Sequence, residues 1–317
     1  MPVHKPGVVA LRPLRLGDFF DGAFATIRRN PTAMVGLAAV VTTVFLVVPV
    51  LLTLALAGTG HLSLDVSGDP AQGGLGALES GAVTALSYLG TVFGALATVV
   101  LNGLLVRVVA EAVLGRRTSA AAAWASTRGR LLRLCGLTAL NLVVVLGLLG
   151  VPLALGIAAG LQVGVAQGLL VGVPLLLAGV AALAFVQVRC FQLAAPALVL
   201  ERIGVVASLR RAAQLSRGQF WRLLGVQLLT VLVVGVVAQV IAVPLTLLGL
   251  AGPLFLPGTT GALVLVFAGY LSQVVVGAVT TPFTSAVVAL QYVDQRIRKE
   301  GLDVQLIAAA QATPGGP

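Results

Sequence analysis

The sequence predicts an all-α fold, a polytopic transmembrane helical bundle of about six spans. Of its 317 residues, 58% are hydrophobic and only 9% are charged, whereas soluble domains carry about 25% charged residues. Long intervals without any lysine, arginine, aspartate or glutamate alternate with segments rich in arginine. Such alternation is typical of helices that cross a membrane and are joined by charged loops.

The uncharged intervals define the spans, because about 20 apolar residues are needed to cross the hydrocarbon core. The intervals 30–64 and 80–106 hold one span each, and 134–188 and 223–293 hold two each. The predicted spans are 32–57, 82–106, 134–157, 163–188, 223–250 and 261–291. The predicted organisation is a cytoplasmic N-terminal segment with an interfacial amphipathic helix (1–31), a six-span membrane domain (32–293) and a cytoplasmic tail (294–317).

The basic residues predict the orientation, since cytoplasmic loops retain lysine and arginine. With six spans, all 20 basic residues fall on one side, and the other side carries only Asp65, Asp69 and Glu79. Asp18 and Asp21 interrupt any apolar stretch that could serve as a cleavable signal peptide. We therefore expect a multi-pass protein of the bacterial plasma membrane with both termini in the cytoplasm.

Part of the sequence repeats. Residues 119–140 resemble 208–229, and residues 23–40 resemble 123–140 more weakly. The repeating unit is predicted to be a cytoplasmic amphipathic helix, a basic turn and a two-span hairpin, present as three parallel copies. A proline in the first span of each copy predicts a shared kink. The prolines are Pro49, Pro152 and Pro244.

The first amphipathic helix is predicted near residues 16–29. Its apolar residues share one helical face, while Arg15, Arg28 and Arg29 lie elsewhere. Two placements remain open: the helix lies in the headgroup layer, or it docks on the bundle. Pro31 is expected to start the first span, where its missing N–H costs nothing. The apolar residues are Leu16, Phe19, Phe20, Ala23, Phe24 and Ile27.

Glycines recur every four residues through the turn between the third and fourth spans. This spacing is typical of a ridge of small residues where helices pack closely, and also of a flexible turn. We favour a mixture, with the ridge on the helical parts. The glycines are Gly156, Gly160, Gly164, Gly168 and Gly172.

No catalytic, cofactor-binding or metal site is predicted. Neither histidine, His4 or His61, lies in a known catalytic motif, and a solvated loop is a better interpretation of His61, Asp65 and Asp69 than a metal site. The predicted spans contain no ionisable residue, so their polarity comes from amides and hydroxyls. Hydrogen bonding between helices is the default role of these groups. If a pathway for a substrate exists, its candidate lining is Asn102, Asn141, Gln239 and Gln273.

Arginines near the predicted helix ends are candidates for contacts with lipid phosphates. The alternative is that they only orient the chain in the membrane. The element Arg128-Gly129 with Arg133 recurs as Arg217-Gly218 with Arg222. The candidates are Arg28, Arg29, Arg128, Arg133, Arg217 and Arg222.

The N-terminal sequence is similar to that of a known family. The segment LRPLRLGDFFDGAF at 11–24, followed by IRRNP at 27–31, resembles the start of the membrane domain associated with glycerophosphoryl diester phosphodiesterases, in its stand-alone bacterial form. The resemblance implies a six-span body. Some members carry a soluble phosphodiesterase barrel as well, but no segment of this sequence fits such a barrel, so no activity is implied.

We expect a non-enzymatic membrane protein that organises membrane lipid or a partner protein. Two alternatives are a passive or lipid-like substrate transporter and a membrane accessory domain for a phosphodiesterase-type enzyme. The expected partners are membrane lipid and a membrane or cytoplasmic protein of unknown identity, with no cofactor. Nucleic acid is not expected, because the basic residues lie between apolar segments and only Lys5 and Lys299 are lysines.

Overall fold

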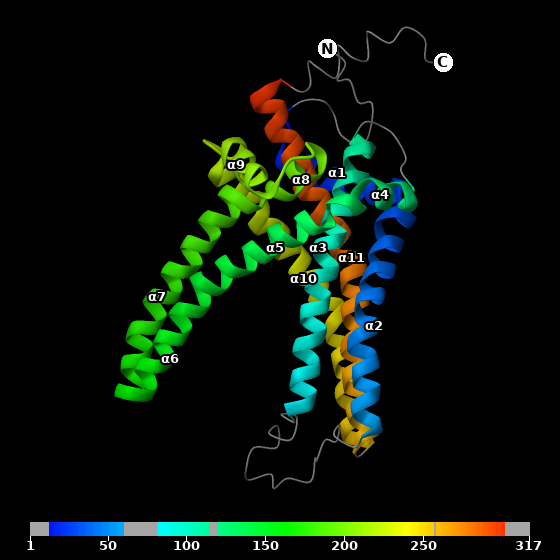
Figure 1. The fold of residues 1–317 in the computed structure, drawn as a ribbon, viewed down its shortest axis with the longest axis vertical. Coiled ribbons are helices and arrows are strands. Elements are labelled where there is room, and N and C mark those ends of the chain that lie inside the picture. Colours follow the sequence, from blue (N-terminus) through cyan, green and yellow to red (C-terminus); the bar gives the residue numbers. More distant parts are fainter. Residues whose placement is uncertain (1–12, 60–80, 114–118, 257, 302–317) are drawn as a thin grey trace.

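The structure is a computed structural model that describes residues 13–59, 81–113, 119–256 and 258–301, which form helices joined by short turns (Figure 1). Six of these helical stretches are long and apolar enough to cross a membrane, and each overlaps one predicted span. The all-α, six-span prediction is confirmed. The last helix continues through Glu300, so the first residues of the predicted tail are helical.

The described elements follow one another along the chain in this order. They are α1 (Leu16–Arg29), η1 (Thr32–Gly36), α2 (Leu37–Gly58), α3 (Gly81–Val113), α4 (Ala120–Thr127), η4 (Arg128–Arg130), α5 (Leu131–Val145), η5 (Leu146–Gly150), α6 (Val151–Val163), α7 (Val165–Val186), η6 (Gln187–Phe191), α8 (Ala194–Leu200), α9 (Val205–Leu215), α10 (Phe220–Phe255) and α11 (Thr259–Glu300).

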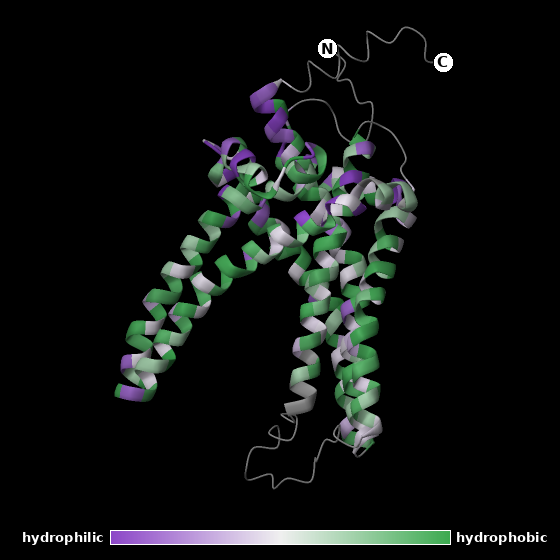
Figure 2. Cartoon of the chain, viewed as in Figure 1, coloured by the Kyte–Doolittle hydropathy of each residue, from purple (hydrophilic) through white to green (hydrophobic). Residues whose placement is uncertain are grey.

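The polar segments lie at one end of the long helices (Figure 2). We call this end of the molecule the basic end. The short helices α1, α4, α8 and α9 lie there (Figure 1). Helical backbone of the first span begins at Pro31, as expected, and the corresponding helices α5 and α10 begin at Leu131 and Phe220. These are the positions that the predicted repeat aligns, so the three similar segments enter their long helices at equivalent residues.

Helix α1 docks on the bundle through part of its apolar face. Phe19 and Ala23 are buried, and α1 packs against α11. Leu16 and Phe24, which we expected on the same face, are 51% and 55% exposed. Phe24 still contacts the bundle, because its ring centroid lies 5.0 Å from that of Phe283 on α11, so Leu16 is the apolar residue of this face that lies at the exposed margin.

Helix α11 is the centre of the bundle, and it packs against α1, α2, α3 and α10. The hairpin of α5, η5, α6 and α7, which we call the arm, diverges from these helices toward the end opposite the basic one (Figure 1). Half of the most apolar stretch of the second span is buried, compared with 0% in the third span and 6% in both the fourth and the fifth. The rest of the described protein therefore covers little of the arm.

Small residues hold the two halves of the arm together. A Cβ added to Gly168 would lie 2.6 Å from the Cα of Gly160, and one added to Gly156 would lie 2.8 Å from the Cα of Gly172. Gly164 has φ of +126° and separates α6 from α7. The predicted mixture is confirmed: four glycines form a close-packed ridge, and the fifth adopts a turn conformation that favours glycine.

The three predicted proline kinks differ locally. Pro49 and Pro244 lie inside α2 and α10, each of which is one continuous helix. Pro152 instead follows a π-helical stretch, η5, at the start of α6. The backbone departs from α-helical geometry next to the second proline only, so a shared kink stays a prediction.

Candidate functional site

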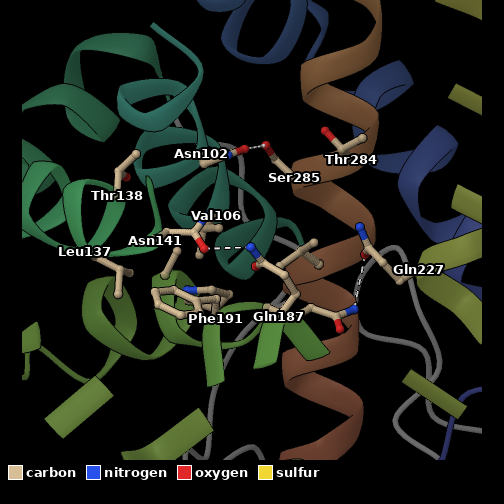
Figure 3. A pocket seen from close by; sticks show the side chains of 14 residues that line it. Asn102, Val106, Leu137, Thr138, Asn141, Gln187, Phe191, Gln227, Thr284 and Ser285 are labelled. Carbon is tan, nitrogen blue, oxygen red and sulfur yellow. Dashed lines mark hydrogen bonds between the residues drawn. The ribbon is translucent and has the colours of Figure 1, made fainter. Parts of the chain in front are cut away.

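A polar cavity lies where the arm joins the rest of the molecule. Its volume is about 270 Å³, and α3, α5, η6, α8, α10 and α11 contribute to its lining. Figure 3 shows side chains from these elements pointing toward one another. The lining residues are Asn102, Val106, Leu137, Thr138, Asn141, Gln187, Phe191, Gln192, Ala195, Pro196, Gln227, Thr284, Ser285 and Val288.

Side-chain hydrogen bonds cross this cavity between helices. The hydroxyl of Ser285 donates to Oδ1 of Asn102 at 2.6 Å, which joins α11 to α3. Nε2 of Gln187 donates to Oδ1 of Asn141 at 2.6 Å, which joins η6 to α5 (Figure 3). The second bond ties the two ends of the arm together at its base. These amides therefore perform the interhelical role expected of polar groups inside a membrane protein.

Gln192 connects the cavity to two more helices. Its Nε2 donates to Oε1 of Gln227 at 3.2 Å and to Oε1 of Gln291 at 2.5 Å. Two buried atoms of this group, Oε1 of Gln192 and Nε2 of Gln291, have no hydrogen-bond partner in the protein. A buried polar atom without a partner costs about 1–3 kcal/mol. Gln192 lines the cavity, whereas Gln291 reaches it only as the hydrogen-bond partner of Gln192. The unpartnered acceptor of Gln192 is therefore the atom that a polar ligand in the cavity could satisfy.

The cavity is uncharged and lies a short distance inside the basic end. None of its lining residues is ionisable. Asn102 precedes Arg107 by five residues on α3, and Asn141 follows Arg133 by eight on α5. At 1.5 Å per residue, Asn102 and Asn141 lie about 8–12 Å from these arginines along their helices.

The structure brings two of the four predicted pathway residues together, namely Asn102 and Asn141. Gln273 lies elsewhere on α11, where a Cβ added to Gly94 of α3 would lie 2.8 Å from its Nε2. Gln239 is exposed on α10. Sequence reasoning missed Gln187, Gln192 and Gln227, although Gln187 lies inside the predicted fourth span and Gln227 inside the predicted fifth.

A second group of polar residues holds the start of α1 against α10 and α11. The carboxylate of Asp294, which is fully buried, accepts from the backbone N–H of Leu14 at 2.8 Å and from Nε of Arg298 at 3.0 Å. Arg222 also donates to Asp294 and to the carbonyl of Leu14, and it lies 5.4 Å from the ring centroid of Phe19. Leu14 and Phe19 belong to the N-terminal motif, so part of that motif is explained by this ion cluster.

A third group at the basic end joins α9 to α11. Nε of Arg211 lies 2.9 Å from Oε1 of Glu201, which Tyr292 also contacts, and Nη2 of Arg211 lies 2.5 Å from Glu300. Burial lowers the pKa of Arg211, but its hydrogen bonds and charge interactions with Glu201 and Glu300 outweigh burial and raise the pKa overall. Arg211 therefore stays protonated at physiological pH.

The predicted lipid-phosphate contacts are not equivalent in the structure. Arg28, Arg29 and Arg217 are exposed, whereas Arg222 is bound to Asp294. Arg128 and Arg133 line a separate cavity at the basic end. Within the described ranges, no three histidine, cysteine, aspartate or glutamate residues are grouped so that they could hold a metal. His61, Asp65 and Asp69 lie outside the described residues.

Six apolar spans with an arginine-rich end define a multi-pass helical membrane protein. Residues 14–295 match the family described as a domain of unknown function (DUF7847), and the chain belongs to that family. No curated protein and no solved structure matches the chain. The resemblance to the phosphodiesterase-associated membrane domain stays a prediction.

Proposed function

We propose that this chain is a multi-pass protein of the bacterial plasma membrane, with both ends in the cytoplasm, that binds a membrane amphiphile. The uncharged polar head of the amphiphile occupies the amide-lined cavity. The observation that carries the proposal is the unpartnered Oε1 of Gln192, a residue that lines a cavity without ionisable residues. The arginine-rich segments support the orientation.

The lining favours an uncharged head. An ionised group taken out of water needs a countercharge, and no residue of the lining supplies one. Amides and hydroxyls instead offer donors and acceptors together. The volume of about 270 Å³ is just under the 300–1,000 Å³ of typical small-molecule pockets. It suits the hydroxyls of a glycerol or one sugar ring, with the acyl chains outside.

The surroundings favour a molecule with apolar chains. Leu142 and Val143, which follow Asn141 on α5, are 55% and 66% exposed, so they face lipid in a membrane. Phe191 and Val288 contribute apolar surface to the cavity itself. A molecule whose head reaches Asn141 therefore lies with its chains against apolar helix surfaces.

The test uses the full chain purified in mild detergent and analysed by native mass spectrometry after addition of a diacylglycerol or a glucosyl-diacylglycerol. The variant Asn141→Leu/Gln187→Met replaces both amides of one hydrogen bond with apolar side chains. Neither amide is therefore left behind without its hydrogen-bond partner. Gln239→Leu is the matched control, because this amide is exposed outside the cavity. We expect the double variant to lose the bound lipid and the control to keep it.

Equal lipid binding by the double variant and the unchanged protein would refute the proposal. Co-purification of a soluble phosphodiesterase, with no lipid bound, would instead support the accessory function that the family resemblance implies. Lipid binding that disappears in the control as well would show that detergent-accessible surface, and not the cavity, holds the lipid.

Movement of lipid between leaflets is the second candidate, and the divergence of the arm beyond the cavity favours it (Figure 1). Against it, Gln239 and Gln273 do not continue the polar lining toward the opposite end. Reconstituted vesicles that hold a fluorescent diacylglycerol would show the movement. Binding without movement would remove this candidate and leave the first in place.

A further inference from the structure

We propose that Arg128, Arg130, Arg133 and Arg202 form a binding site for a phosphate group at the basic end. These residues line a cavity of about 390 Å³ together with Ala125 and Gly129. Arg128 and Arg130 come from the turn η4 between α4 and α5, Arg133 comes from the first turn of α5, and Arg202 comes from the loop after α8. The sequence separates the two segments by about 70 residues, so only the fold places these charges around one space.

A defined contact brings the two segments together. Nη1 of Arg130 donates to the backbone carbonyl of Val199 at 3.3 Å, which ties η4 to the last turn of α8. Arg202 follows this turn by two residues. Arg128, Arg133 and Arg202 are exposed, whereas Arg130 is half-buried. Arg130 thus positions the turn, and the other three guanidinium groups are accessible to a ligand.

The backbone at Arg202 is unusual. Its φ is +60°, and among the described residues it is the only one other than glycine with a positive φ. Glycine is the usual residue at this position after a helix, and a larger residue there costs about 1–2 kcal/mol. Such a conformation is a reason to look for a function of the side chain. Here the side chain faces a cavity lined by three further arginines.

The side chains that line this site carry positive charge and no negative charge. None of the lining residues is a carboxylate. Glu201 precedes Arg202 in the chain, but it is bound by Arg211 and Tyr292. Guanidinium groups bind phosphate through pairs of parallel hydrogen bonds, and they do so better than ammonium groups. A group with two or more charged oxygens is therefore the ligand that this lining fits.

Two sources could supply the phosphate: the headgroup of an anionic lipid, or a soluble phosphate. The site is independent of the amide cavity, because Arg133 precedes Asn141 by eight residues on α5, about 12 Å along the helix. The double variant Asn141→Leu/Gln187→Met is accordingly expected to bind phosphate normally. If the amide cavity binds no lipid, the proposal of a phosphate site is unaffected, and the reverse also holds.

The test measures binding to the full chain in detergent by calorimetry, with dihexanoyl phosphatidylglycerol, dihexanoyl glycerol, glycerol 3-phosphate and inorganic phosphate as separate probes. Arg133→Gln/Arg202→Gln is expected to raise the Kd for the phosphate-bearing probe about tenfold or more, which corresponds to about 1.4 kcal/mol. Arg28→Gln/Arg29→Gln removes the same charge from the end of α1 and is expected to change the Kd less than about twofold.

A further variant separates binding from folding. Arg202→Gly removes the guanidinium and suits the positive φ, so we expect weaker phosphate binding with an unchanged or higher Tm. Binding of phosphatidylglycerol but not of glycerol 3-phosphate or inorganic phosphate would identify a lipid headgroup as the source, and the converse a soluble phosphate. Dihexanoyl glycerol is compared in the Asn141→Leu/Gln187→Met variant, in which the amide cavity is not expected to hold a lipid. The proposal is refuted if this variant binds dihexanoyl glycerol and the phosphate-bearing probe equally, if both arginine pairs lose binding equally, or if Arg202→Gly binds phosphate unchanged.

Discussion

The two copies of the Arg-Gly element have the same residues and different environments. In the first copy, Arg128 and Arg133 line a cavity without a carboxylate. In the second, Arg222, which aligns with Arg133, is bound to the fully buried Asp294. The comparison teaches that a basic motif at a helix end becomes either a structural ion pair or an accessible cationic surface. The presence of an acid on a neighbouring helix decides between the two.

The largest loss of stability is expected from removal of Asp294, the carboxylate that binds Arg222 in the second copy. Asp294→Ala leaves Arg222 and Arg298 without their shared partner and Leu14 without its acceptor. Removing one member of a buried ion pair costs about 3–5 kcal/mol. Thermal unfolding in detergent measures the loss. Asp21→Ala, which removes an exposed carboxylate from α1, should leave the Tm nearly unchanged, and an equal loss in both variants would contradict the comparison.

The aligned arginines are expected to respond differently to the same substitution. Arg222→Gln should cost about 1–3 kcal/mol, because hydrogen bonds to Asp294 and to the carbonyl of Leu14 are lost. Arg133→Gln should stay within about 0.5 kcal/mol, as surface substitutions usually do. Unfolding curves of the two variants, recorded side by side, check the difference. Similar losses would mean that Arg133 also has a structural role.

The aligned glycines provide a smaller test. Gly218 has φ of +72°, whereas Gly129 does not have a positive φ, and an added Cβ would meet no atom within 4 Å at either position. Gly218→Ala should therefore cost about 1–2 kcal/mol for the left-handed conformation. Gly129→Ala should be neutral or stabilising by up to about 1 kcal/mol. A Tm that falls equally in both would show that the turns are more alike than their backbones indicate.

The smallest expected change in stability comes from making the first copy resemble the second. Ala125 lines the arginine cavity and is exposed, so Ala125→Glu supplies the missing carboxylate. An exposed ion pair should add no more than about 1 kcal/mol, while phosphate binding should weaken markedly because the new carboxylate competes for the guanidinium groups. Ala125→Gln is the control without the charge. Retained phosphate binding in the glutamate variant would place the ligand away from this cavity.

Much of the fold could be predicted from local features of the sequence. The lengths of uncharged intervals set the number of spans, Pro31 set where the first long helix begins, and four-residue spacing identified the glycine ridge. Each of these depends on residues that are close together in the chain. Length, charge and small-residue spacing act within one helix or one hairpin, so the sequence alone carries them.

The site was decided by tertiary structure. Asn102 and Asn141 were identified as polar residues inside spans, but their meeting with Gln187 and Gln192 depends on how η6 and α8 fold back between α5 and α11. Gln239 has the same chemistry and lies on an exposed face. Arg202 joins Arg133 only because Arg130 holds α8. The spans are apolar on nearly every side, so the sequence does not specify how each helix is rotated about its axis. Contacts between distant segments fix that rotation, and with it which polar side chains meet.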